Sequence, residues 1–334
     1  MTYKLKIILY AILTFNVTFS YAQDKTYAEK LGYPKGSKLL ILHVDDAGMS
    51  DDSNIGVETA LEKGIANSCS MMMPCSWTQG FIHYLNLHPN TDAGLHLTLT
   101  SEWKDYRWAP VMGSKAVPGL TDSEGAMWPD VIDVIKHASP DEVEMEIRAQ
   151  LDKALKMGWK PTHIDSHMGT VLATSEFIQR YVKVAIEFKI PAMFPGGHCT
   201  LIRKQMDLAD AQLNMMHAVG NQLWNAGLPV LDDLHNESYD WPIPPDAISD
   251  TNKLRDFKTE KYLTAIQSLK PGITMMIMHC TETSPNFSHI SNSGPIRKGD
   301  LLAMLNPILK QEIIKEGIIL VTWRELMQKR SLIK

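Results

Sequence analysis

The sequence lacks several features that would place it in a class at once. It holds only 4 cysteines in 334 residues, too few for a disulfide scaffold, so we expect buried free thiols at Cys69, Cys75, Cys199 and Cys280. The formal net charge is only -5 and no cluster of Lys and Arg stands out, which argues against nucleic acid as a partner. The absence of a Gly-rich phosphate-binding loop argues against a nucleotide-binding fold.

The amino terminus has the three parts of an export signal. Lys4 and Lys6 precede an apolar run over residues 7–19, and the small residues Ser20 and Ala22 follow. A run of about 13 apolar residues is shorter than the roughly 20 that a membrane-spanning helix needs. We therefore expect residues 1–22 to be a cleaved signal peptide. The mature protein is then periplasmic or extracellular and has no membrane span.

The remaining chain alternates apolar runs with helical patterns. Hydrophobic residues make up 44% of the sequence and charged residues 21%, which is typical of a soluble globular protein. We expect strands at 39–44, 69–73, 93–99, 162–166, 192–194, 272–278 and 318–321, and helices at 53–63, 140–157, 177–188, 258–269 and 301–316. This alternation predicts an α/β fold, and the number of units favours a distorted TIM-like (β/α) barrel in which residues 23–334 form a single domain.

Two neighbouring carboxylates follow the first predicted strand. Asp45 and Asp46 stand between the apolar run and Ala47-Gly48, at a strand's carboxyl end, which is where barrel enzymes build their active sites. One carboxylate can bind a metal ion while its neighbour accepts a proton. The structural alternative is an Asx turn that caps the following helix.

Histidines occur in two further predicted strands. His96 lies between leucines, and such an isolated histidine is more often a hydrogen-bonded core residue than a ligand. In the segment from Thr162 to His167, a period of two places His163, Asp165 and His167 on one face. Burying two imidazoles and a carboxylate together is costly without a cation or a hydrogen-bond network. These ligand types suit zinc and similar divalent metals, and Mg²⁺ or Mn²⁺ in a hydrated site.

Two later residues also follow predicted strands. His279 comes directly after the apolar run over residues 273–278, where it can act as a general acid or base, or as a structural cap. Trp323 follows the last predicted strand, where it can line a pocket.

Taken in order, these motifs resemble the family of YdjC-like carbohydrate deacetylases, also called chitooligosaccharide deacetylase-like proteins, which are relatives of the polysaccharide deacetylases. The resemblance runs through Val44-Asp45-Asp46-Ala47-Gly48, Gly94-Leu95-His96-Leu97-Thr98, Thr162-His163-Ile164-Asp165-Ser166-His167, Met278-His279 and Arg297. It covers most of the chain after residue 22. It implies a distorted TIM-like barrel that hydrolyses acetyl groups of N-acetylated or O-acetylated sugars or oligosaccharides.

The resemblance also implies a role for each matching residue. Asp46, His96 and His163 correspond to the ligands of one divalent metal ion, Zn²⁺ or Mg²⁺. Asp45 corresponds to the catalytic base and His279 to the proton donor. Contacts with the sugar are expected from His167, Arg297 and Trp323.

The sequence departs from the family pattern near the expected sugar pocket. Met168-Gly169-Thr170 stand where the family often has further histidines, and Cys280-Thr281 replace the usual proline-glycine after His279. Two other functions remain open at this stage. One is a non-catalytic glycan-binding protein on a deacetylase scaffold, which the missing histidines favour. The other is a metal-dependent phosphodiesterase, which would need a basic phosphate clamp that the motifs lack.

Overall fold

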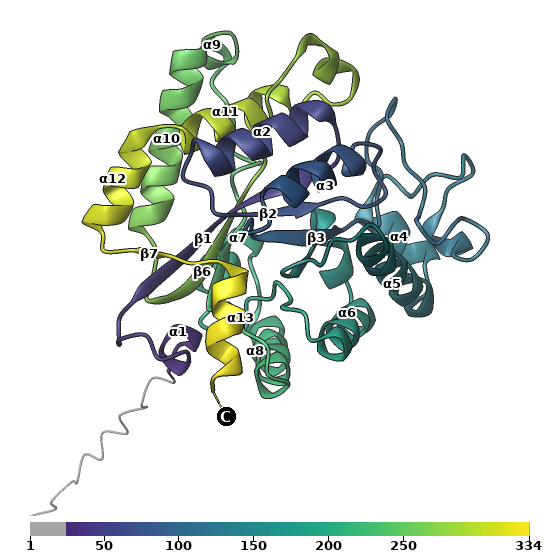
Figure 1. The fold of residues 1–334 in the computed structure, drawn as a ribbon, viewed down its shortest axis with the longest axis horizontal. Helices are drawn as coiled ribbons and strands as arrows, with labels where there is room; N and C mark the ends of the chain where they lie inside the picture. The colour runs from purple at the N-terminus through teal and green to yellow at the C-terminus, as the bar shows by residue number, and fades with distance from the viewer. Residues whose placement is uncertain (1–24, 334) are drawn as a thin grey trace, which may run out of the picture.

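The computed structural model describes residues 25–333, so the expected signal peptide lies outside the described residues. The strands lie in the middle of the molecule and most of the helices lie around them (Figure 1). The strands are β1 Lys38–Ala47, β2 Ser68–Met71, β3 Ala93–Leu97, β4 Ile164–Ser166, β5 Asp233–His235, β6 Gly272–Met278 and β7 Ile319–Leu320. The α-helices are α1 Tyr27–Lys30, α2 Asp51–Glu62, α3 Thr78–Leu87, α4 Val131–His137, α5 Pro140–Lys156, α6 Ser175–Phe188, α7 Thr200–Met206, α8 Asp210–Asn225, α9 Pro245–Ile248, α10 Thr251–Gln267, α11 Gly294–Met304, α12 Pro307–Lys315 and α13 Trp323–Ser331. Short 3₁₀ helices are η1 Pro118–Leu120, η2 His167–Leu172 and η3 Pro285–His289.

The strands form a parallel sheet in the order β4-β3-β2-β1-β6-β5, and β7 pairs with the first half of β1. Two isolated parallel bridges continue the sheet beyond β4 and join it to β5, so that the strands form a ring. Ile164 pairs with Ala192, and Pro195 pairs with Leu231, just before β5. The ring is therefore closed by single bridges instead of a full strand, and the expected distorted TIM-like barrel is confirmed.

The central strand β1 is buried along almost its whole length. Residues 39–47 are inaccessible to solvent or nearly so, and residues 38–44 pair in register with β6. Strands of a parallel sheet are covered on both faces, which explains the near-continuous apolar run over residues 39–42. The exception is His43, a fully buried imidazole inside the barrel.

Helix α5 begins at a strong local capping signal, and the helix also restrains a long loop. Ser139 caps the helix in a reciprocal capping box with Glu142, and Pro140 occupies the first turn. The buried Glu146 carboxylate then accepts the backbone N–H groups of Val111 and Met112, each at 2.8 Å. The Trp-rich and Pro-rich segment after β3 is thus tied to the helix layer.

The helices surround the ring (Figure 1). Helix α10 packs against α11, and α5 packs against α6. All four cysteines are buried and free, which confirms the expectation from composition. Within residues 25–333, none of the helices combines the length and apolarity needed to cross a membrane.

Three expected elements differ from the structure, and one of them is the helix expected over 258–269, which already begins at Thr251 as α10. The segment 192–194 makes only isolated bridges, and the single helix expected over 301–316 is interrupted between α11 and α12. The interruption has a clear cause. Asn306 caps α12 by accepting the N–H of Ile308, and Pro307, which lacks a backbone N–H, opens the new helix.

Gly94 on β3 gives a direct test of this packing. A Cβ atom at position 94 would lie 2.3 Å from Nε2 of the fully buried His163 ring. We expect Gly94→Ala to lower the free energy of unfolding by about 1–3 kcal/mol, as overpacking of a core does. Thermal denaturation should then show a melting temperature lower by several degrees.

Gly80→Ala is the matched control. Gly80 is exposed on α3, and its Cβ would meet nothing closer than 3.5 Å. Alanine is favoured over glycine in a helix by roughly 0.5–1 kcal/mol, so this variant should melt at or slightly above the parent temperature. Equal stability of the two variants would contradict the close approach of His163 to β3.

Candidate active site

Asp45 and Asp46 lie at a break in β1. The pairing with β2 changes register between Val44 and Ala47, and Asp46 has a φ of 69°, a left-handed conformation that aspartate tolerates better than most residues. A regular strand would send the two side chains to opposite faces. Instead, both carboxylates approach the same imidazole: His96 Nε2 is 3.3 Å from Asp46 Oδ1 and 3.8 Å from Asp45 Oδ2.

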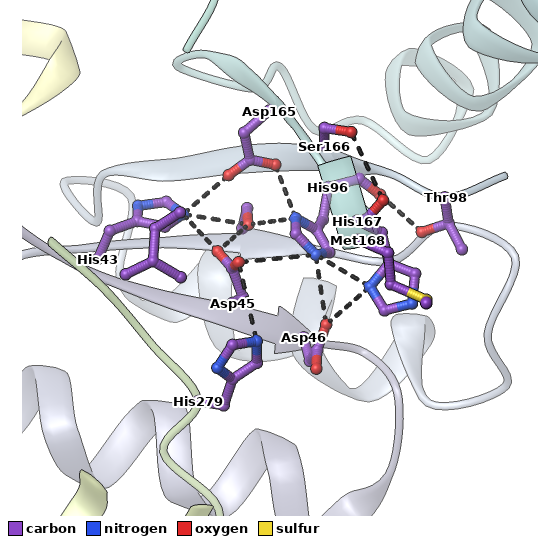
Figure 2. Close-up of polar contacts among 12 residues, drawn as sticks. His43, Asp45, Asp46, His96, Thr98, Asp165, Ser166, His167, Met168 and His279 are labelled. Atoms are coloured by element: carbon purple, nitrogen blue, oxygen red, sulfur yellow. Dashed lines mark hydrogen bonds and ion pairs between the residues drawn. The ribbon is translucent and has the colours of Figure 1, made fainter. Parts of the chain in front are cut away.

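Three donor atoms form a nearly equilateral triangle beside this break (Figure 2). Asp46 Oδ1 is 3.3 Å from His96 Nε2 and 3.4 Å from His167 Nδ1, and the two nitrogens are 3.3 Å apart. Ligands that each lie about 2.05 Å from a tetrahedral ion are themselves about 3.3 Å apart. Asp46 Oδ1 is also buried without a hydrogen-bond partner. The triangle therefore fits a divalent cation.

The other nitrogen of each imidazole is held by a carboxylate. Asp165 Oδ1 lies 2.8 Å from His96 Nδ1, and Glu102 Oε2 lies 3.0 Å from His167 Nε2. Carboxylates in this position fix the tautomer of a metal-binding histidine, because they accept a hydrogen bond from the N–H of the nitrogen that does not bind the metal. The nitrogens that face Asp46 then keep their lone pairs for a cation.

The electrostatic surroundings favour positive charge at the triangle. Burial alone would lower the pKa of His167, but the carboxylates of Glu102 and Asp46 raise it to about 9. Burial likewise opposes a rise at His96, yet the Asp45 and Asp165 carboxylates raise the pKa of His96 well above its usual value. Surroundings that stabilise the positive charge of a protonated imidazole also stabilise a metal cation bound in place of the proton.

Arg297 lies against Asp46 and does not present its guanidinium to solvent. Its Nη1 is 2.6 Å from Asp46 Oδ2, and only 2% of the residue is exposed. Burial would raise the pKa of Asp46, but this ion pair holds it well below the usual range. The rings of Trp103 and Tyr239 flank the guanidinium at 5.6 and 5.4 Å. The structure thus places Arg297 as a support for Asp46, not as the expected sugar contact.

His163 lies too deep in the barrel to share a metal ion with Asp46 and His96 in the way that the family resemblance implies. Its ring stacks on Trp323 with the centroids 5.2 Å apart, and its nearest grouping of donor atoms is with His43 and Asp165. Burial lowers the pKa of His163 to about 4, so the ring is neutral near pH 7. The set Asp46, His96 and His163 is therefore corrected: the structure brings His167, not His163, to the other two.

The register of β4 explains this correction. His96 pairs with Asp165, which places His163 two residues earlier along the strand and His167 two residues later. Two residues advance a strand by about 6.6 Å, so the side chains lie at different levels of the barrel. Trp323 shares the deep level, is fully buried, and so does not line a sugar pocket as expected.

Asp45 and His279 face each other beside the triangle (Figure 2). Asp45 Oδ1 is anchored by His43 Nε2 at 3.1 Å and by the Ser70 hydroxyl at 3.3 Å. Asp45 Oδ2 lies 4.0 Å from His279 Nε2. Burial lowers the pKa of His279 below its usual value, so the ring is mainly neutral near pH 7 and has to take up a proton before it can donate one. One carboxylate oxygen and one imidazole nitrogen are thus available for proton transfer.

Sequence reasoning gave no role to three residues of the site. Asp165 belongs to the alternating motif, but nothing in the sequence marks it as the partner of His96. His43 lies two residues before Asp45, on the same face of β1, and its Nε2 is 2.9 Å from Asp165 Oδ2. Glu102 lies in an irregular loop after β3, where no periodicity marks a site residue.

The fold and the site together define a parallel α/β barrel with a candidate metal centre at the carboxyl ends of its strands. The chain belongs to the YdjC-like protein family, which matches residues 39–315. The family resemblance inferred from the motifs is thereby confirmed.

Known relatives agree with this assignment. A carbohydrate deacetylase of Thermus thermophilus is 26% identical over 301 residues, which cover 90% of this chain and 97% of the relative. A carbohydrate deacetylase of Brevibacillus brevis is 36% identical over 159 residues, which cover 47% of this chain and 59% of the relative. A solved structure from Enterococcus faecalis, of a protein named for a proposed cleavage of cellobiose phosphate, has a TM-score of 0.68 at 20% identity and covers 87% of this chain and 99% of its own. This last likeness supports the fold.

Proposed function

We propose that the protein is a metal-dependent deacetylase that removes acetyl groups from N-acetylated or O-acetylated sugars or oligosaccharides. The observation that carries the proposal is the position of Asp45. Its free oxygen lies 3.8 Å from His96 Nε2, a corner of the ligand triangle, and 4.0 Å from His279 Nε2. A base and an acid thus flank a candidate cation site, an arrangement suited to metal-assisted amide hydrolysis. The carbohydrate deacetylases among the relatives support the substrate class.

The residues divide the work as follows. Asp46, His96 and His167 would hold the ion, with Asp165 and Glu102 orienting the two imidazoles. A divalent cation held there would supply Lewis acidity, which would lower the pKa of a water molecule and polarise an acetyl carbonyl. Asp45 accepts a proton at Oδ2, while His43 and Ser70 hold Oδ1 and so fix the direction of the free oxygen. His279 delivers a proton from Nε2 to the departing amine.

The site argues against the two other functions considered for the sequence. A phosphodiesterase would need a free cationic clamp, but the guanidinium of Arg297 is already paired with Asp46. A protein that only binds glycans would not need a second buried carboxylate beside the ligand triangle. Burying a carboxylate is costly unless contacts offset the cost, and the contacts of Asp45 with His43 and Ser70 occupy Oδ1 and leave Oδ2 for proton transfer.

Acetate release is the direct test of this function. We expect the purified protein to release acetate from a panel of N-acetylglucosamine oligosaccharides and O-acetylated xylo-oligosaccharides, to lose this activity with a chelator, and to regain it with Zn²⁺ or Mg²⁺. A melting curve with the chelator should show that the fold persists. Sugar binding without any acetate release would support the glycan-binding alternative, and activity that resists metal removal would contradict a metal-dependent reaction.

Asp45→Asn and His279→Ala separate the two proton-transfer roles. The amide that replaces the Asp45 carboxylate is close to it in shape, so the fold and metal content should be unchanged while turnover falls by about 10²- to 10⁴-fold. His279→Ala should slow an N-acetyl substrate strongly and an activated aryl acetate weakly, because a good leaving group needs little protonation. Near-parental turnover by Asp45→Asn would show that this aspartate is only a structural turn residue.

A further inference from the structure

A fully buried lysine lies beside the proposed active site without taking part in it. Lys258 on α10 has no exposed surface, which is rare for lysine unless its charge is paired. Its Nζ is 2.8 Å from Asp300 Oδ1 and donates a second hydrogen bond to the carbonyl oxygen of Ser238 at 2.6 Å. Apolar side chains of similar volume often stabilise a fold as well as a buried ion pair does, so stability alone does not explain this one.

Asp300 connects the lysine to the proposed proton donor. Its Oδ2 accepts the backbone N–H of His279 at 3.0 Å, directly after the end of β6. Its Oδ1 accepts the hydroxyl of Tyr262 at 2.7 Å in addition to the lysine. Both carboxylate oxygens are therefore used, and one of them fixes the backbone that carries the His279 ring.

The helix that carries Asp300 also reaches the candidate metal site. Arg297 and Asp300 are three residues apart on α11, a spacing that places two side chains on the same side of a helix. Arg297 binds Asp46 and Asp300 binds the backbone of His279. One helix thus sets the position of His279 relative to a proposed metal ligand.

The Ser238 contact extends the restraint to the ring of His279. The Ser238 hydroxyl donates to the carbonyl oxygen of Ile277 at 2.8 Å, which fastens this loop to β6. The ring of the next residue, Tyr239, makes a T-shaped contact with the His279 ring, with the centroids 4.9 Å apart. The lysine therefore helps to hold an aromatic ring against the imidazole.

We propose that the buried ion pair of Lys258 and Asp300 positions His279 for proton donation, by fastening α11 and the Tyr239 loop to the end of β6. The inference rests on the proposed function, in which His279 is the proton donor. Both members of the pair are positioning residues, since neither reaches the reacting atoms. A displacement of about 1 Å can cost 10²-fold in rate, so such a restraint has a measurable catalytic effect.

Two double variants isolate the bond to His279. Lys258→Met with Asp300→Leu removes the charges and also the acceptor for the His279 N–H. Lys258→Met with Asp300→Asn removes the same charges but keeps an amide oxygen as acceptor. We expect the leucine variant to lose about 10- to 100-fold in kcat on an N-acetyl sugar and less than about threefold on an aryl acetate. The asparagine variant keeps the bond to the His279 N–H but lacks the ion pair and the lysine contact with Ser238, so we expect an intermediate loss of about 3- to 10-fold in kcat on the N-acetyl sugar and less than about threefold on the aryl acetate.

Hydrogen exchange at the His279 amide supplies a readout that needs no activity. Exchange should be at least about tenfold faster in the leucine variant than in the parent, and near parental in the asparagine variant. If the parent releases no acetate, the proposed function fails, and exchange still decides whether the ion pair restrains His279. Parental exchange in the leucine variant, or an equal loss of kcat on both substrates, would overturn the positioning role.

Two single variants guard against a general loss of stability. Asp232→Asn alters another buried carboxylate that holds three backbone N–H groups, those of Tyr27, Ala28 and Ile273, and it should leave the ratio of the two activities unchanged. If the leucine variant does not fold, Tyr262→Phe is the milder substitute, because it removes only the hydrogen bond that the Tyr262 hydroxyl donates to Asp300. It should shift the same ratio in the same direction, and an unchanged ratio would contradict the proposal.

Discussion

The break in β1 is the constraint on which the site depends. A left-handed Asp46 costs of order 1–3 kcal/mol, so it persists only where its surroundings hold it in place. Here the pairing of β1 with β6 continues in register up to Val44, and Arg297 secures the carboxylate beyond the break. The break turns two consecutive carboxylates toward one side of the strand. In a regular strand the two side chains would point to opposite faces, so one carboxylate would point away from the site, which would then lose either a ligand or a base.

The depth of each polar side chain in the barrel decides its role. His163 is deep, neutral and packed between Gly94 and Trp323, which makes it part of the core. His96 and His167 lie nearer the carboxyl ends of the strands. Carboxylates contact His96 Nδ1 and His167 Nε2, which leaves His96 Nε2 and His167 Nδ1 directed at Asp46. Residues of the same type in one motif therefore serve packing at one level and proposed chemistry at the next.

The sequence predicted those elements whose signals are local. The helical pattern over residues 140–157 and the apolar run over 272–278 gave bounds that agree with α5 and β6 to within one residue. It did not predict β5, because this strand has only three residues and one of them, Asp233, is a buried carboxylate that accepts backbone N–H groups of α7. A period of two placed His163 and His167 on one face. Only the pairing of His96 with Asp165 tells which of them lies beside Asp46.

The most direct test of the account is the location of the ion itself. Anomalous diffraction from crystals grown with Zn²⁺, or with Mn²⁺ in place of Mg²⁺, would locate it independently of any activity. The account predicts one strong peak within about 2.0–2.2 Å of Asp46 Oδ1, His96 Nε2 and His167 Nδ1. A peak bound by His163 instead, between His43 and Asp165, or no peak at the triangle in an active enzyme, would contradict it.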